Sequence, residues 1–193
     1  MKKVMTLAVL LVMALTASAK GGDLNIVNGS LTALKDAGKT VIVAFDYNGA
    51  TIEGQSVMEY LKGRGEQNVK DWPEDNKEVA KKFVEAFNKS NKKGAQIVKG
   101  DKGDYKIIIK AEKLDFGSGA ASVVWGFGAG GSKIWGTLTV IDQNSGNNIC
   151  TLEIDEVDGG SSYTEVGRRC DTAEHLAELL AKLIKKSKYE LNI

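Results

Sequence analysis

The sequence has few of the residues from which catalytic and metal centres are built. It contains one histidine, His175, and two cysteines, Cys150 and Cys170. Structural zinc sites use four ligands at short spacings, and redox-active cysteines usually stand close together in a CxxC motif, so neither kind of site is indicated. We therefore expect no metal ion and no cofactor.

The two cysteines favour a structural disulfide instead. An isolated pair in an oxidising compartment is usually bonded, and the parity of its predicted strand turns Cys150 inward. Closing the loop between them would stabilise the fold by about 3 kcal/mol in the chain-entropy model. We predict a bond between Cys150 and Cys170; a redox-active pair, with Arg168 and Arg169 lowering the pKa of Cys170, is the alternative.

The chain also lacks an excess of charge of either sign. Its 26 basic residues nearly balance 25 acidic ones, and Lys2 and Lys3 belong to a segment that we expect to be removed. A nearly neutral chain has no global attraction for nucleic acid or for an anionic membrane. A single proline and 42% hydrophobic residues indicate a folded domain rather than a disordered chain.

Residues 1–19 have the pattern of a secretory signal peptide. A positive start is followed by an apolar run from Val4 to Leu15 and by the small-residue cleavage site Ala17-Ser18-Ala19. The run is shorter than the ~20 residues that span a bilayer, which disfavours the alternative of an N-terminal membrane anchor. We expect cleavage after Ala19, one domain over residues 20–193 without a transmembrane segment, and a periplasmic or secreted location.

Apolar spacing predicts a single α+β domain, a mixed, largely antiparallel sheet with two main helices packed against it. A period of two marks strands, and a period near 3.6 marks amphipathic helices. The predicted strands are 39–47, 105–116, 133–142 and 149–155, with shorter extended segments at 24–27 and 95–98. The main helices are expected at about 73–92 and 171–188, and shorter ones at 31–37 and 55–62.

Two details of the strand pattern are specific. The run of Val, Ile and Phe over residues 39–47 indicates a central strand that is covered on both faces. In the following long strand, Leu114 has the opposite parity from Ile109, so we place a β-bulge near Glu112 or Lys113.

Helix boundaries follow from capping residues. Pro73 is expected in the first turn of its helix, where a missing N–H has no helical partner to lose. Asp171 and Glu174 form an acidic variant of the capping box at the start of the last helix. Four lysines crowd the last turns of that helix: Lys182, Lys185, Lys186 and Lys188. We interpret them as a solvated helix end that suits the negative end of the dipole, with an anionic binding surface as the alternative.

Two candidate motifs fail on their context. The segment from Gly126 to Gly131 satisfies GxGxxG, but in dinucleotide-binding proteins these glycines open a helix, whereas a strand is predicted here. His175 would need a nucleophile, and no G-x-S-x-G elbow is present. We therefore interpret His175 as a histidine on the helix surface.

The enzymatic alternative is a periplasmic or secreted hydrolase that uses His175 or strand carboxylates. Paired carboxylates can hydrolyse glycosides by acid–base chemistry. The candidates are Asp46, Asp115, Asp142, Glu153 and Asp155. Carboxylates at solvated strand edges are much commoner than catalytic pairs, so an enzyme is the less favoured interpretation.

The unusual feature of the sequence is a glycine-dense tract between two predicted strands. Six of the residues from Gly117 to Gly131 are glycine, and four apolar residues lie between them: Val123, Val124, Trp125 and Phe127. Contiguous exposed apolar surface tends to mark interaction sites. We predict that these four side chains form an interaction surface for an envelope protein partner, a membrane or another copy of the chain. The alternative is a hairpin connection whose aromatic side chains pack onto the sheet.

The signature FGSGAAS…GFGAGGSKIWGTLTVIDQNSGNNICTLEI resembles a family of secreted or envelope proteins of Gram-negative bacteria, of the domain-of-unknown-function kind. In that family a glycine-rich tract precedes a strand that ends in D-x-x-[ST/N]-G, as the segment from Asp142 to Gly146 does here. More remotely, the chain is similar to the N-terminal domain of the TolB translocation protein and to outer-membrane lipoproteins that assist curli secretion and peptidoglycan synthases, although it lacks their lipidated cysteine. The resemblance covers residues 41–184 and implies a fold without any catalytic residue. We expect a non-enzymatic binding or assembly module of the cell envelope.

Overall fold

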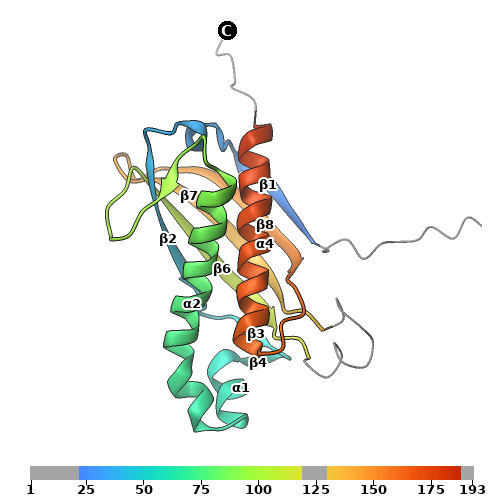
Figure 1. Ribbon diagram of the computed structural model, residues 1–193. Coiled ribbons are helices and arrows are strands. Elements are labelled where there is room, and N and C mark those ends of the chain that lie inside the picture. The colour runs from blue at the N-terminus through green and yellow to red at the C-terminus, as the bar shows by residue number, and fades with distance from the viewer. Residues whose placement is uncertain (1–21, 119–129, 188–193) are drawn as a thin grey trace, which may run out of the picture.

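One sheet and two long helices dominate the computed structural model, which describes residues 22–118 and 130–187 (Figure 1). The strands are β1 Asp23–Gly29, β2 Thr40–Asp46, β3 Thr51–Ile52, β4 Gln55–Ser56, β5 Gln96–Ile97, β6 Tyr105–Asp115, β7 Lys133–Asp142 and β8 Asn148–Asp158. The helices are α1 Val57–Gly63, α2 Glu66–Ser90 and α4 Glu165–Lys186, with a 3-10 turn, η1, at Thr32–Lys35. The predicted α+β class is confirmed.

The sheet is mixed rather than largely antiparallel. Its order is β1-β8-β7-β6-β2-β5, and the short strands β3 and β4 extend it beside β6. β1, β8, β7 and β6 pair antiparallel, whereas β2 is parallel to both β5 and β6 and β3 is parallel to β6. Parallel neighbours need a crossover connection, and α2 provides it between β2 and β6. The prediction went wrong because it treated α2 as a cover for the sheet and not as a crossover.

β2 is not the central strand that its apolar run predicted. Only the two-residue strand β5 lies beyond it at that edge of the sheet. Val43 and Phe45 pack against the core on the helix side, while most of the strand is only half buried. Ile42, on the opposite face, is also buried, so the apolar run indicated buried side chains but not a central place in the sheet.

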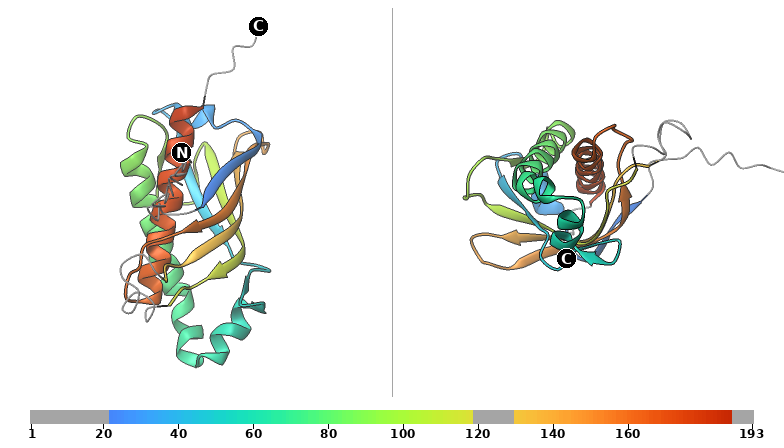
Figure 2. Two further views of the ribbon diagram at one scale, coloured as in Figure 1. Left: turned by 90° about the vertical axis from the view of Figure 1, so that its right-hand side faces the viewer. Right: turned by 90° about the horizontal axis from the view of Figure 1, so that it is seen from below.

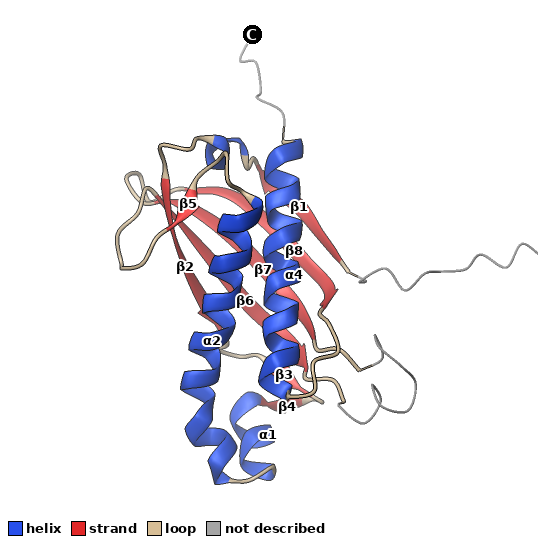
Figure 3. Cartoon of the chain, viewed as in Figure 1, coloured by secondary structure: helices blue, strands red, loops and turns tan. Residues whose placement is uncertain are grey.

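α2 and α4 lie side by side on one face of the sheet and run in the same direction (Figures 1 and 2). Phe83 and Phe87 of α2 and Leu176 and Leu180 of α4 have no exposed surface. Complete burial of one such side chain contributes about 1.5–3 kcal/mol relative to exposure. The strands form a single layer behind the helices (Figure 3). The parallel direction of the two helices brings both of their carboxyl ends to the same end of the molecule.

The predicted β-bulge is confirmed. The register between β6 and β7 shifts between Ala111 and Lys113, opposite Gly136. Gly136 has φ +154°, and a Cβ atom there would lie 2.1 Å from the carbonyl oxygen of Lys110. Only glycine permits this close approach of two backbones.

Both long helices begin earlier than predicted. α2 starts at Glu66 and carries Pro73 in its interior. The turn before Pro73 stays helical because Trp72 is buried there, with its ring 5.2 Å from that of Tyr47 and 6.0 Å from that of Phe116. Tertiary packing thus outweighs the hydrogen bond that proline removes.

The start of α4 is set by Thr164, whose hydroxyl accepts a hydrogen bond from the N–H of Gly167 at 3.1 Å. Asp171 and Glu174, the predicted capping pair, therefore lie inside the helix. The Asp171 carboxylate accepts instead from the hydroxyl of Ser162 at 2.6 Å. The predictions of the short elements are more accurate, since β1, β5 and α1 occur where extended or helical segments were expected. The expected helix at 31–37 is the shorter turn η1.

Cys150 and Cys170 are not bonded to each other, contrary to the prediction, and both are buried free thiols. The strand parity was right, because Cys150 points inward and is 1% exposed. However, eight residues of β8 separate Cys150 from Asp158, about 26 Å at 3.3 Å per residue. Asp158 contacts His175, less than two turns along α4 from Cys170. A disulfide needs Cα atoms within about 7 Å, so the length of β8 keeps the thiols apart.

Burial raises the pKa of both thiols to about 11. Because the thiolate is the reactive form, we expect neither cysteine to react with a thiol reagent in the native protein near pH 8. Both should react after unfolding without any reductant, as measured by a colorimetric thiol titration. Unfolded protein that shows no thiol until a reductant is added would contradict the free cysteines.

Candidate functional site

The two ends of the glycine tract meet at one end of the sheet, where β6 ends and β7 begins. The N–H of Ser118 donates to the carbonyl oxygen of Gly130 at 3.1 Å. Gly117 has φ +64°, and a Cβ atom there would lie 2.1 Å from the same Gly130 oxygen, so glycine is required. We call residues 116–118 and 130–132 the tract base. The predicted interaction residues lie between these two segments, outside the described residues: Val123, Val124, Trp125 and Phe127.

Arg168, in the first turn of α4, fixes the β6 side of the tract base. Its side chain is buried, and its Nε donates to the carbonyl of Phe116 at 2.8 Å and its Nη2 to that of Gly117 at 3.4 Å. Nη1 donates to the carbonyls of Ser162 and Tyr163 at 3.2 and 3.0 Å. One guanidinium group therefore joins two chain segments, and its four backbone acceptors compensate for the burial of its charge.

Thr172, one turn further along α4, fixes the β7 side of the tract base. Its hydroxyl donates to the carbonyl of Ser132 at 2.8 Å, and the two hydroxyl oxygens are 2.5 Å apart. The N–H of Gly159, just after β8, donates to the same Ser132 carbonyl at 2.9 Å. A Cβ atom at Gly159 would lie 2.3 Å from the backbone nitrogen of Thr172. The ends of β6, β7 and β8 are thus all held against the start of α4.

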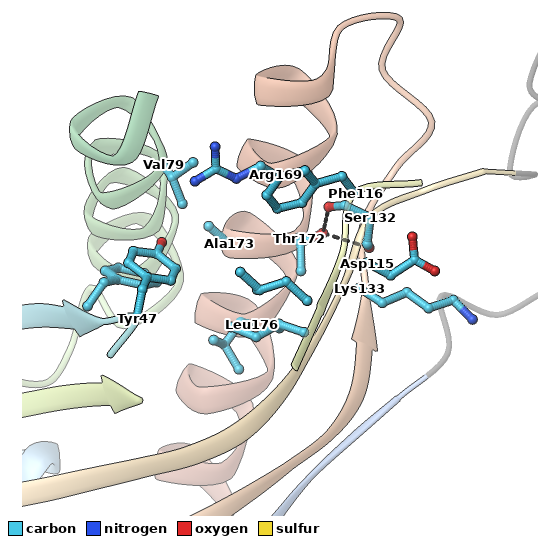
Figure 4. A pocket seen from close by; sticks show the side chains of 13 residues that line it. Tyr47, Val79, Asp115, Phe116, Ser132, Lys133, Arg169, Thr172, Ala173 and Leu176 are labelled. Atoms are coloured by element: carbon cyan, nitrogen blue, oxygen red, sulfur yellow. Dashed lines mark hydrogen bonds between the residues drawn. The ribbon is translucent and has the colours of Figure 1, made fainter. Parts of the chain in front are cut away.

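Arg169 covers a small apolar cavity next to the tract base (Figure 4). The cavity has a volume of about 30 Å³ and lies among side chains that include Tyr47, Phe116 and Leu176. Space of this size holds one or two water molecules. The guanidinium carbon of Arg169 lies 4.2 Å from the ring centroid of Trp72 and 5.0 Å from that of Phe116, which is cation–π geometry.

Arg169 also determines the electrostatics around this cavity. It donates to the side-chain oxygen of Asn76, and its Nη1 lies 3.9 Å from the Asp75 carboxylate without a hydrogen-bond acceptor among the described residues. Burial raises the pKa of Asp75 and the pKa of Tyr47, and the positive charge of Arg169 opposes both shifts. The buried guanidinium group of Arg169 thus links α4 to Trp72 and Asn76 of α2 beside the cavity.

His175 is buried, whereas the sequence predicted a side chain on the exposed surface of the helix. It is 7% exposed, and its Nδ1 lies 2.6 Å from the backbone carbonyl oxygen of Asp158. A carbonyl can only accept, so Nδ1 carries the proton and donates it. The prediction failed because the extended end of β8 covers a face of α4 that periodicity alone assigned to solvent.

Three of the five strand carboxylates considered for a hydrolase accept hydrogen bonds within local turns. Each of three accepts a hydrogen bond from the backbone N–H two residues further on, at 2.7–2.9 Å: Asp46, Asp115 and Asp142. These are local turn interactions of the kind that aspartate favours. Glu153 and Asp155 are exposed on β8. In the described part of the chain, no hydrogen bond joins any two of the five carboxylates.

Among residues 22–118 and 130–187, no three side chains of His, Cys, Asp or Glu gather closely enough to hold a metal ion. Within these ranges, no helix combines the length and the hydrophobicity needed to cross a bilayer.

Sequence reasoning missed Arg168, Arg169 and Thr172 as residues of the site. The arginines were considered only as neighbours of Cys170, because the helix was predicted to start after them. The signal that could have found them is Thr164, a preferred N-cap residue. A start at Thr164 places both arginines on the first turns of α4, facing the ends of the strands.

The family model described as Domain of unknown function (DUF4410) matches residues 41–158, more than half of the chain. The chain belongs to the DUF4410 family. In this DUF4410 protein the match extends from β2 to the end of β8 and so includes the glycine tract and both strands at its base, but not α4.

No curated protein matches this DUF4410 chain. Among solved structures, it is similar to PelC from Paraburkholderia phytofirmans, solved as a dodecamer, with 11% identity and a TM-score of 0.44 over 82% of this chain and 97% of that one. A second PelC dodecamer from the same organism, carrying one substitution, gives 12% identity and a TM-score of 0.42 over the same shares. Similarity at this level does not show that this chain shares the assembly or any partner of PelC.

We expect Arg168→Met to lower the free energy of unfolding by about 2–4 kcal/mol, because four backbone carbonyls lose their donor while most of the side-chain volume is kept. Chemical denaturation measures this change. Arg64→Met is the matched control, because Arg64 is an exposed arginine paired with Glu165, and such pairs are worth less than about 1 kcal/mol. Equal small losses in both variants would contradict the role given to Arg168.

Proposed function

We propose that this DUF4410 protein is a non-enzymatic binding or assembly module of the cell envelope, and that Val123, Val124, Trp125 and Phe127 contact its partner. The supporting observation is the tract base, whose two segments are joined to each other and held to α4. A binding segment whose two ends are already fixed loses less conformational entropy when it binds.

The chemistry of the four residues favours apolar recognition. Tryptophan and phenylalanine are enriched in the buried centres of protein interfaces, where a few large side chains provide most of the binding energy. The chain carries nearly balanced charge, so long-range attraction contributes little to partner choice. The partner that fits is an apolar surface of an envelope protein or of a second copy of this chain.

The hydrolase alternative receives no support from the described residues. The Nδ1 of His175 is engaged by the Asp158 carbonyl, and three of the five candidate carboxylates are engaged by turn N–H groups. A general base must reach the proton that it removes, and a catalytic carboxylate pair must flank one substrate bond. The geometry of these groups instead suits turns and the packing of α4.

The proposal includes a location in the envelope of a Gram-negative bacterium, which the secretory signal pattern of residues 1–19 supports. Cleavage after Ala19 would release the module into the periplasm or the medium. N-terminal sequencing of the chain purified from the cell envelope tests this step. Lys20 is the expected first residue, and retention of residues 1–19 would count against it.

The binding proposal predicts that Trp125→Ser combined with Phe127→Ser abolishes partner capture and leaves the thermal midpoint nearly unchanged. Loss of two aromatic anchors typically removes more than about 4 kcal/mol of binding free energy, which is about a thousandfold in affinity. Chemical crosslinking in the native envelope followed by affinity purification measures capture by another protein. Sedimentation equilibrium of the purified chain measures self-association.

A matched control replaces two exposed apolar side chains on β1, away from the tract base, through Ile26→Ser with Val27→Ser, which are 43% and 66% exposed in the wild type. This variant should capture the partner as the wild type does. If the tract variant unfolds at a much lower temperature than the control, the aromatic residues belong to the core and the proposal fails. Unchanged capture and unchanged sedimentation in the tract variant would also refute it.

A further inference from the structure

A basic groove lies at the end of the molecule opposite the tract base, where α2 and α4 both end (Figure 1). Three segments that are far apart in the sequence line it: η1, the end of α2 with the residues after it, and the last turn of α4. The groove has a volume of about 510 Å³, within the range of ligand pockets in proteins. Five lysines line it: Lys35, Lys89, Lys92, Lys93 and Lys185.

The floor of the groove is fixed by hydrogen bonds. The side-chain amide of Asn91, which is 3% exposed, donates to the carbonyls of Leu34 and Ala95 at 3.4 and 3.0 Å. The N–H of Ala95 donates to the same Leu34 carbonyl at 3.0 Å, and Lys35 Nζ donates to the carbonyl of Ser187. The three lining segments are therefore joined before any ligand binds, and little ordering is needed on binding.

The charge of the groove exceeds what the helix ends can neutralise. The carboxyl end of a helix carries the equivalent of about half a negative charge, so the two helices together offset about one of the four charges left when Lys35, which is engaged by Ser187, is set aside. No carboxylate lines the groove among the described residues. The adjacent Asp36 carboxylate accepts from the N–H of Gly38 at 2.8 Å and does not line it. Helix capping alone therefore does not account for the other four lysines of the groove.

The lining contains lysines and no arginine, which favours a ligand held by its negative charge rather than by a fixed pair of hydrogen bonds. Arginine is favoured where a carboxylate or a phosphate is held by two parallel hydrogen bonds, whereas lysine acts as a compact point charge with three donors that can turn toward several oxygens. Four such charges around one groove favour a ligand that carries more than one negative charge. We infer that this groove binds a multiply charged phosphate group, held by the ammonium groups of Lys89, Lys92, Lys93 and Lys185. Such a group can belong to a soluble phosphate compound or to a lipid headgroup.

Two probes distinguish these sources: pyrophosphate in isothermal titration calorimetry, and phosphatidylglycerol–phosphatidylcholine vesicles in a flotation assay. Both are used with the full chain at about 20 mM ionic strength, where charges are weakly screened. The test variant is Lys92→Gln, Lys93→Gln and Lys185→Gln. Each lysine near an anionic headgroup contributes about fivefold in affinity, so binding should weaken roughly 100-fold.

The control variant removes the same charge elsewhere, through Lys62→Gln, Lys70→Gln and Lys110→Gln, which are all exposed in the wild type. It should bind both probes as the wild type does, with the same thermal midpoint as the test variant. Binding of pyrophosphate identifies a soluble phosphate ligand, and binding of vesicles alone identifies a lipid headgroup. The inference is overturned if the wild type binds neither probe, or if the two triple variants weaken binding equally.

Discussion

Backbone carbonyl groups at the end of a sheet have no strand partner, and each one buried without a donor costs about 1–3 kcal/mol. In this protein the first turns of α4 supply the donors. Arg168 donates to carbonyls at the end of β6 and in the loop before α4, and Thr172 donates to the carbonyl of the residue just before β7. These hydrogen bonds hold the start of α4 against the strand ends, next to the backbone bond between Ser118 and Gly130 that closes the tract base.

The same direction of α2 and α4 gives the two ends of the molecule different chemistry. At the amino end of α4 the helix dipole disfavours cations, so Arg168 and Arg169 are stable there only because carbonyls, aromatic rings and Asp75 surround them. At the carboxyl ends the dipoles favour cations, yet the lysines exceed what the dipoles can neutralise. One end therefore holds two arginine charges among carbonyls and aromatic rings beside the tract base, and the other presents excess positive charge in a groove.

The structural features that depend on local sequence pattern were predicted correctly. The long strands, the bulge opposite Gly136, the inward face of Cys150 and the existence of both long helices follow from periodicity and glycine placement. What depends on tertiary geometry was missed. The crossover through α2, the distance that β8 puts between the thiols, and the covered side chain of His175 each need the relative position of two elements. Arg168 and Arg169 were missed because one residue, Thr164, moves the helix start by nearly two turns.

Hydrogen exchange of individual backbone amides, followed by NMR in the wild-type protein, tests the closure of the tract base most directly. The N–H groups of Ser118 and Gly159 stand outside the strand ladders and donate to the carbonyls of Gly130 and Ser132. Arg168 and Thr172 of α4 donate to the carbonyls of Gly117 and Ser132 in the same tract base. The account predicts that both exchange slowly, with protection close to that of amides in the centre of β7, because they open only with α4. Exchange of either amide at the rate of an unstructured peptide would contradict it.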